Sequence, residues 1–210
     1  MKGANKIISQ RYEEYWSLTL EYSDIYGEQF NFTLNYIVNY IDKYQYNIVY
    51  NNELQKIYNE LQKDLMIIYK KVDMASVRKS INQFIKLGFI NPGLYSYHYK
   101  TKKFLNEKNI ERKKILFSEI VYSNASLRSS VTKKSEEKEI NFFIKTLEHN
   151  RKLTNDDIMA LMTTVPSHYP KGFLTKEELK NIYSVYYIND FQKRKYNQKN
   201  YIMKVFKMLE

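Results

Sequence analysis

The sequence contains no cysteine, so disulfide bonds, thiolate zinc sites and a cysteine nucleophile are all excluded. Histidine is also rare. The three histidines, His98, His149 and His168, lie far apart and in no spacing typical of metal ligands, so we predict no metal site in this chain. Five glycines and three prolines are few for 210 residues, which favours helices over a turn-rich all-β fold.

Long apolar runs are missing as well. No stretch approaches the length of a transmembrane helix, and the first residues, MKGANKIISQRYEEYW, lack the apolar core of a signal peptide. We therefore expect a soluble, cytoplasmic protein with no membrane partner. Hydrophobic residues make up 43% of the chain and aromatic residues 16%, which is enough apolar surface for one large domain or two small ones.

Positive charge is concentrated in one part of the chain. The net charge is +11, and residues 73–134 hold 13 lysines and arginines against 4 acids. Residues 1–72 hold 8 against 9, and residues 135–210 hold 13 against 10. A general preference for lysine would spread along the chain and would not remove acids from one stretch. The local excess is typical of a nucleic-acid-binding surface.

Three helices are predicted in the first half of the chain. Residues 28–44, 51–71 and 74–87 place apolar residues at helical spacing, and the third helix is bounded by Asp73 as its cap and Gly88 as its end. The expected inward residues are Phe30, Leu34, Ile37, Val38 and Ile41 in the first helix, Leu54, Ile57, Leu61, Leu65 and Ile68 in the second, and Val77, Ile81, Phe84 and Ile85 in the third.

A short β-hairpin is expected after the third helix. Residues 89–90 form its first strand, residues 91–93 (Asn-Pro-Gly) form the turn, and residues 94–99 return with period two. The order helix, helix, helix, hairpin is that of a winged helix. Its third helix would enter the major groove of DNA, and the hairpin would be the wing.

Further helices are predicted to follow. One starts at Thr101, and another covers residues 109–124. Two capping boxes, Thr154-x-x-Asp157 and Thr175-x-x-Glu178, open helices later in the chain. In the helix over 109–124 the expected inward residues are Ile110, Ile115, Leu116, Phe117, Ile120 and Val121.

These elements predict a mainly α fold made of tandem winged-helix-like units, each with at most a small β-hairpin wing. The first unit would cover residues 1–125 with its flanking helices, and the second would cover residues 140–210. Residues 126–139 hold few apolar side chains and are expected to form a linker or loop. Residues 201–209 carry an apolar helical face with no stop signal behind it, which indicates that another surface covers them.

The third helix and the wing supply the candidate DNA contacts. Arginine and lysine suit guanine, asparagine and glutamine suit adenine, and lysines near the wing suit phosphates. The tyrosines at 95, 97 and 99 either stack on an exposed base or pack the wing on the helices. The predicted groove contacts are Arg78, Lys79, Asn82, Gln83 and Lys86, and the predicted phosphate contacts are Lys100, Lys102, Lys103 and Lys113.

No catalytic residues are assigned. Asp157 with Glu178-Leu-Lys180 has a spacing compatible with a PD-(D/E)xK nuclease, but both carboxylates fall in capping boxes and no strand pair lies between them. Glu148-His149 and His168 lack the spacing of an HNH nuclease. Helix-surface chemistry explains all of these residues equally well.

The segments SVRKSINQFIKLGFIN, TKKFL and INFFIKTLEHNRKLTNDDIMALM, in this order, resemble the recognition region of type IIS and nicking restriction endonucleases of the FokI and AlwI kind. The likeness covers roughly residues 73–182. It implies tandem winged-helix subdomains that read double-stranded DNA, with cleavage by a separate C-terminal PD-(D/E)xK domain. No position here matches the catalytic residues of that family.

The resemblance therefore predicts sequence-specific binding of double-stranded DNA by the recognition portion of a restriction endonuclease. No cofactor is expected in this chain, and Mg²⁺ is expected only if a cleavage domain or partner is present. A catalytic domain, a catalytic subunit or a second copy would dock on residues 201–209. Two alternatives stay open: a complete Mg²⁺-dependent DNA endonuclease, and a stand-alone winged-helix regulator of transcription or replication.

Overall fold

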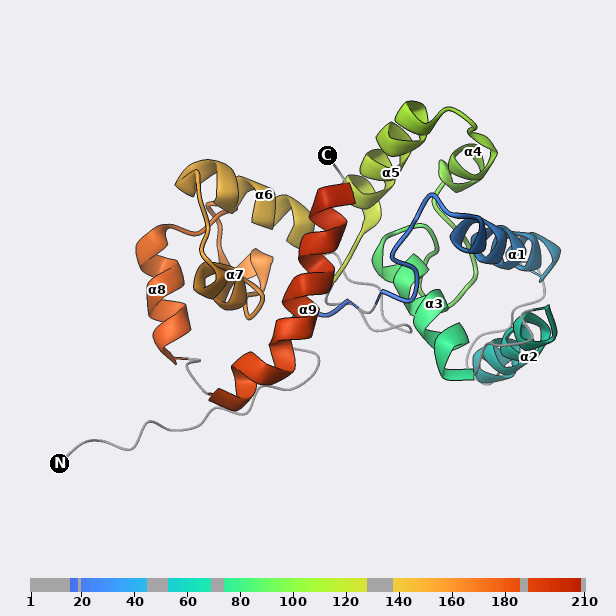
Figure 1. Cartoon of the computed structure of the whole chain (residues 1–210), viewed down its shortest axis with the longest axis horizontal. Coiled ribbons are helices and arrows are strands. Elements are labelled where there is room, and N and C mark those ends of the chain that lie inside the picture. Colours follow the sequence, from blue (N-terminus) through green and yellow to red (C-terminus); the bar gives the residue numbers. More distant parts are fainter. Residues whose placement is uncertain are drawn as a thin grey trace.

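The computed structural model describes residues 16–18, 20–44, 53–68, 74–127, 138–185 and 189–208. Within these ranges the structure is mainly helical and contains no β-strand, so the predicted mainly α class is confirmed (Figure 1). The elements are α1 (Glu28–Tyr44), α2 (Glu53–Ile68), α3 (Met74–Lys86), α4 (Thr101–Asn106), α5 (Ile110–Asn124), α6 (Glu139–Asn150), α7 (Asn155–Leu161), the 3₁₀ turn η2 (Pro166–His168), α8 (Lys176–Val185) and α9 (Asn189–Met208).

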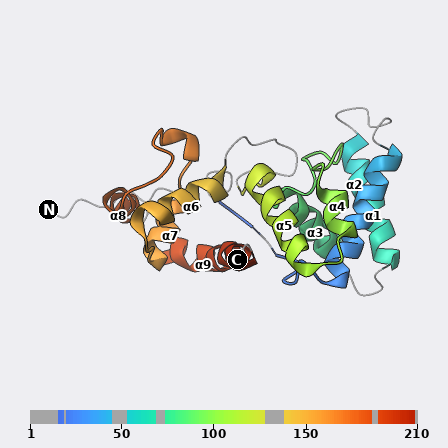
Figure 2. The same cartoon turned by 90° about the horizontal axis from the view of Figure 1, so that it is seen from above.

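The helices lie in two groups. Helices α1 to α5 form the first group and α6 to α8 the second, and α9 runs between them (Figure 1). The view from above separates the same two groups along the long axis (Figure 2). The buried apolar side chains nevertheless form one continuous cluster that includes residues from both groups.

The apolar faces predicted for the first and third helices are confirmed. All five inward residues of α1 and all four of α3 are at most 3% exposed. An aromatic cluster fills the space between them, with Phe30 edge-to-face on Phe84 at 4.9 Å and on Phe89 at 5.5 Å between ring centroids. In α2 the buried side chains include Ile57, Leu61 and Leu65.

Three of the predicted inward residues are exposed instead, and one lies outside the described side chains. Ile68 is 41% exposed at the end of α2, and Ile110 and Ile115 of α5 are 47% and 59% exposed. The buried face of α5 includes Lys113. This face is therefore rotated about the helix axis relative to the predicted one, and Ile110 and Ile115 lie outside it. The side chain of Leu54 belongs to the residues that the structure does not describe, and so does the predicted cap Asp73.

The predicted glycine end of α3 is confirmed. Gly88 has φ +87°, the left-handed region that favours glycine, and follows directly on the last turn of the helix. A Cβ atom added here would lie 2.7 Å from the Asn124 carbonyl carbon and 2.8 Å from the Ala125 nitrogen. The end of α5 therefore packs on the turn that ends α3, and only glycine leaves room for it.

The predicted β-hairpin wing is absent. Among the described residues, the segment 89–98 is a loop with one isolated antiparallel bridge between Ile90 and Tyr97. The His98 N–H donates to the Phe89 carbonyl at 2.9 Å, and the Asn91 N–H donates to the Ser96 carbonyl at 3.0 Å. The pairing stops after these bonds because residue 101 already begins α4.

Both predicted capping boxes are present. Thr154 accepts from the Asp157 N–H at 3.2 Å and the Asp157 carboxylate accepts from the Thr154 N–H at 2.7 Å. Thr175 and Glu178 make the same two bonds at 3.3 and 2.8 Å at the start of α8. The two acids thus cap the first turns of α7 and α8, and these two helices pack on each other.

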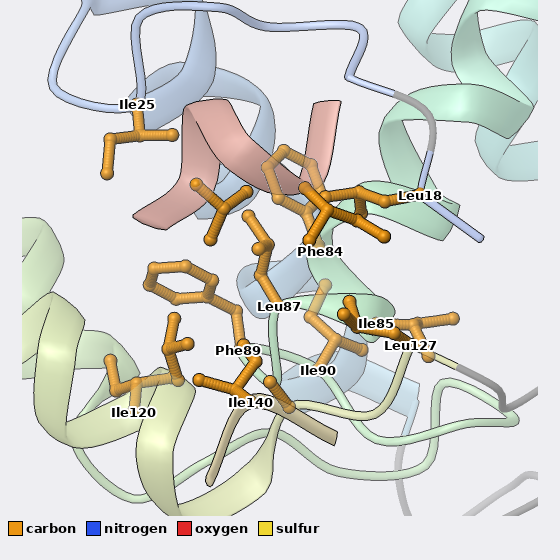
Figure 3. Close-up of a cluster of buried hydrophobic side chains, with 14 of the residues drawn as sticks. Leu18, Ile25, Phe84, Ile85, Leu87, Phe89, Ile90, Ile120, Leu127 and Ile140 are labelled. Atoms are coloured by element: carbon orange, nitrogen blue, oxygen red, sulfur yellow. The ribbon is translucent and has the colours of Figure 1, made fainter. Parts of the chain in front are cut away.

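The predicted linker is packed at both of its described ends. Ser126 and Leu127 lie in a non-helical stretch and are buried, and Glu139, the first residue of α6, is buried as well. Close to them, Ile140 of α6 lies in the same cluster as Phe89 of the first group (Figure 3). The intervening residues 128–137 lie outside the described ranges.

The apolar face of residues 201–209 is covered by the chain itself over its described part, which corrects the prediction of a docking surface. Ile202 and Val205 are 1% and 2% exposed. Phe206 stacks on Phe143 with 4.0 Å between ring centroids. The last carbonyl of α9, that of Met208, accepts a hydrogen bond from the Tyr26 hydroxyl at 3.3 Å.

Among the described helices, none combines the length and the apolarity that crossing a lipid bilayer requires.

Candidate nucleic-acid interface

The groove-facing side predicted for α3 is partly covered by Ser17, Glu21 and Tyr22 of the same chain. Gln83 is fully buried there. Its Oε1 accepts from the N–H groups of Glu21 and Tyr22 at 2.8 and 2.9 Å, and its Nε2 donates to the Tyr22 carbonyl at 2.9 Å. The prediction that Gln83 faces DNA is therefore wrong, because its carboxamide pairs with peptide groups that would otherwise be buried without partners.

Lys86 is also buried, at 8% exposure, where an exposed groove contact was predicted. Its Nζ donates to the Ser17 hydroxyl at 3.1 Å and to the Leu127 carbonyl at 2.9 Å. Burial lowers the pKa of Lys86 to about 8, and the negative charge of Glu139 opposes this shift. The lysine therefore joins three segments of the chain and is not available to DNA.

Lys113, predicted as a phosphate contact, lies inside as well. It is 8% exposed, and its Nζ donates to Asn31 Oδ1 at 2.7 Å. The same nitrogen lies 4.7 Å from the centre of the Phe104 ring. Burial lowers the pKa of Lys113, and the cation–π contact with Phe104 compensates part of the cost.

The remaining predicted residues of α3 are accessible. Arg78 and Lys79 are exposed and Asn82 is half-buried. In Figure 1, α3 begins beside α2, whereas α4 lies at the other end of the first group. The structure therefore does not bring Arg78 and Lys79 together with the lysines of α4.

Two lysines near α4 are paired with acids. Lys100 Nζ lies 2.9 Å from Glu119 and Lys102 Nζ lies 2.7 Å from Asp42. The bonds to Asp42 and Tyr97 raise the pKa of Lys102, which stays charged at any working pH. Both pairs are accessible to solvent, so the lysines can exchange these acids for phosphate at little cost.

Exposed cations without an ion pair among the described residues lie in α4, in the loop after it and at the start of α5. Lys103, predicted as a phosphate contact, is one of them. Two others, Lys108 and Arg112, were not predicted. Both were part of the positive charge counted over residues 73–134. Their exposure was not predicted, because the sequence pattern placed Ile110 and Ile115 on the inward side of α5, whereas these two residues face solvent. We call residues 99–112 with these side chains the α4 surface.

The tyrosines of the loop before α4 do not share one environment. The Tyr97 hydroxyl donates to Asp42 at 2.7 Å and packs the loop on α1. Tyr99 is 77% exposed. Its ring lies 4.5 Å from that of His98, tilted by 35°, at the amino-terminal side of α4. The packing role thus holds for Tyr97, and Tyr99 faces solvent.

His98 and Ser123 form a pair that resembles a catalytic dyad in composition only. His98 Nε2 lies 3.0 Å from the Ser123 hydroxyl, and His98 Nδ1 accepts from the Lys100 N–H at 3.2 Å. Because Nδ1 is the acceptor, the proton of the neutral ring lies on Nε2 and points at the serine. A base for serine would need the opposite arrangement, so this pair holds the loop on α5.

The acids considered for a nuclease are engaged in helix starts. Asp157 also bonds Lys176, and Glu178 lies 3.5 Å from Lys171. These contacts and the cap bonds lower the pKa of both carboxyl groups. Within the described residues no group of three histidines and acids is arranged to hold a metal ion.

The chain matches no protein-family model, no curated protein and no solved structure. The resemblance to restriction-endonuclease recognition regions therefore stays a prediction from the sequence.

Proposed function

We propose that the protein binds double-stranded DNA through the α4 surface, as the recognition portion of a restriction-type endonuclease. The observation that carries the proposal is the exposure of the three cations Lys103, Lys108 and Arg112, close together in the segment (residues 73–134) where the net charge is +9. Cations that no protein acid neutralises attract phosphates and release the counterions bound to DNA. Lys100 and Lys102, in accessible ion pairs, extend the same surface.

Base reading is assigned to fewer residues than the sequence predicted. Arg78, Lys79 and Asn82 remain accessible on α3, and their side chains suit guanine and adenine edges. In this proposal α1, α2 and α3 stand in the order of a helix-turn-helix unit without a wing. The α4 surface then supplies affinity, and α3 supplies discrimination.

The salt dependence of binding tests the proposal. The triple variant Lys103→Gln/Lys108→Gln/Arg112→Gln removes three cations from the α4 surface. A matched control, Lys145→Gln/Lys152→Gln/Lys180→Gln, removes three exposed cations from the second helix group. Binding of a fluorescein-labelled 24-base-pair duplex is followed by anisotropy from low to moderate salt. Affinity for DNA decreases as salt increases, so log affinity plotted against log salt has a negative slope. We expect this slope to become shallower by about 2 to 3 in the first variant, at about 0.9 for each lost phosphate contact.

The control variant should keep the slope of the wild-type protein. Equal losses in both variants would show that only the net charge attracts DNA, and would contradict a defined interface.

A randomised duplex library, with and without Mg²⁺, separates the proposed role from its alternatives. An asymmetric bound motif without cleavage supports a recognition portion. A palindromic or repeated motif favours the regulator, and cleavage of the bound duplexes favours a complete nuclease.

A further inference from the structure

The aromatic ring of Tyr99 faces solvent, and the backbone that carries it is held by hydrogen bonds. The loop beneath it is held by the His98 N–H bond to Phe89, and Thr101, fully buried, donates from its hydroxyl to the same carbonyl at 2.9 Å. The Thr101 N–H donates to the His98 carbonyl at 2.9 Å. These bonds hold the backbone before and after Tyr99.

One side of the ring is already supported. The His98 ring lies 4.5 Å from it and is itself held by Ser123 Oγ and the Lys100 N–H. With 77% of the residue exposed, most of the Tyr99 side chain faces solvent. A tyrosine loses little conformational entropy on binding because it has two side-chain torsions, and a supported ring loses less.

One cation lies against this ring, and two more lie in neighbouring elements. Lys100 Nζ lies 5.5 Å from its centre, and Lys103 follows on α4. Lys138, at the start of α6, donates to the carbonyl of Ser123 at 2.8 Å, and the hydroxyl of the same serine lies 3.0 Å from His98 Nε2. Glu119, which pairs with Lys100, is the acid that faces this group.

We infer that Tyr99 is a stacking platform for an unpaired nucleobase, with Lys100, Lys103 and Lys138 as contacts for the adjoining phosphates. The inference rests on the proposed DNA binding and extends it, because a paired base inside an intact duplex offers no open face to a tyrosine. A bulged or extrahelical base does. Stacking of a base on an aromatic ring combined with cations for the backbone is how proteins bind unpaired nucleotides.

The test uses the full chain and two duplexes. One is a perfect 24-base-pair duplex, and the other carries a single additional 2-aminopurine nucleotide as a bulge. Affinity is measured by anisotropy, and stacking is measured by quenching of 2-aminopurine emission. We expect the wild-type protein to bind the bulged duplex roughly 5- to 100-fold more tightly and to quench the emission.

Three variants separate stacking from other effects. Tyr99→Ala should lose both the preference for the bulged duplex over the perfect duplex and the quenching, and Tyr99→Phe should retain both. Phe173→Ala is the matched control, because Phe173 stacks on His149 at 4.1 Å in the second helix group. This control should behave as the wild-type protein does.

The outcomes also distinguish the two proposals. If the wild-type protein shows no preference for the bulge, or if Tyr99→Ala keeps the preference and the quenching, the stacking platform is contradicted and duplex binding stands. If the triple variant of the α4 surface binds the perfect duplex as the wild-type protein does, the proposed interface fails whatever Tyr99 does.

Discussion

Two polar residues of α3 lie inside the protein because they bond to segments that are distant in sequence. Gln83 satisfies two N–H groups and one carbonyl of residues 21–22, and Lys86 satisfies Ser17 and Leu127. The helical spacing of apolar residues places Gln83 and Lys86 on the polar side of α3, because no feature of the neighbouring sequence distinguishes them from Arg78 and Lys79. Their substitution would therefore affect folding first, and DNA binding only as a consequence.

Lys86 gives the stability a defined dependence on pH. Its pKa is about 8 in the folded chain and 10.5 in the unfolded chain. Below about pH 8 both states carry the proton, so the full cost of burying the charge is present. Between these two values only the unfolded chain binds the proton, so raising the pH stabilises the folded state.

We expect the wild-type protein to gain about 2 kcal/mol in unfolding free energy between pH 7 and 9.5 relative to Lys86→Met. Urea unfolding of both proteins at the two pH values measures the difference. Lys103→Met, which removes an exposed lysine, is the control and should follow the wild-type protein at both pH values. If the difference in unfolding free energy between the wild-type protein and Lys86→Met is the same at pH 7 and pH 9.5, Lys86 does not lose its proton in the folded state over this range.

The turn between α3 and the bridged loop is the element on which α5 packs. Gly88 adopts a left-handed φ, and a Cβ atom at this position would collide with the backbone at Asn124 and Ala125. Gly172 has a similar φ of +76°, but a Cβ atom there would meet only the Lys145 side chain, at 3.7 Å. Substituting the two glycines therefore distinguishes the cost of a strained φ, which applies at both positions, from the cost of close packing, which applies only at Gly88.

Gly88→Ala should cost about 2 to 5 kcal/mol of unfolding free energy, from the strained φ together with overpacking against backbone that cannot move aside. Gly172→Ala should cost about 1 to 2 kcal/mol, from the strain alone. Urea titrations of the two variants give both values. Equal costs would contradict the close contact between α5 and the turn after α3.

Much of the helical structure could be predicted because its signals are local. Spacing placed the inward faces of α1 and α3, and reciprocal side-chain caps placed the starts of α7 and α8. The wing was wrong because period-two tyrosines and an Asn-Pro-Gly turn also suit a loop with one bridge. The candidate site was predicted in part: Lys103 by position, but Lys108 and Arg112 only by charge, since their exposure depends on how α5 rotates on the core.

At the scale of the whole molecule, an extended segment ties the two helix groups together. The Trp16 N–H donates to the Met162 carbonyl at 2.8 Å, and its indole Nε1 donates to the Thr164 carbonyl at 3.0 Å. The next residue, Ser17, donates from its N–H to Leu127 at 2.9 Å. A segment assigned by sequence to the first unit therefore contacts both groups, which no local pattern could indicate.

Trp16 is the only tryptophan in the chain and is fully buried, so its fluorescence reports on this connection. Because one continuous cluster of buried side chains spans both groups, we expect them to unfold together. Urea transitions followed by tryptophan fluorescence and by far-ultraviolet circular dichroism should then share one midpoint. If the fluorescence changes first and a second dichroism transition follows at higher urea, the groups separate before they unfold. The protein would then consist of two independently stable units, with the Trp16 segment as a detachable link.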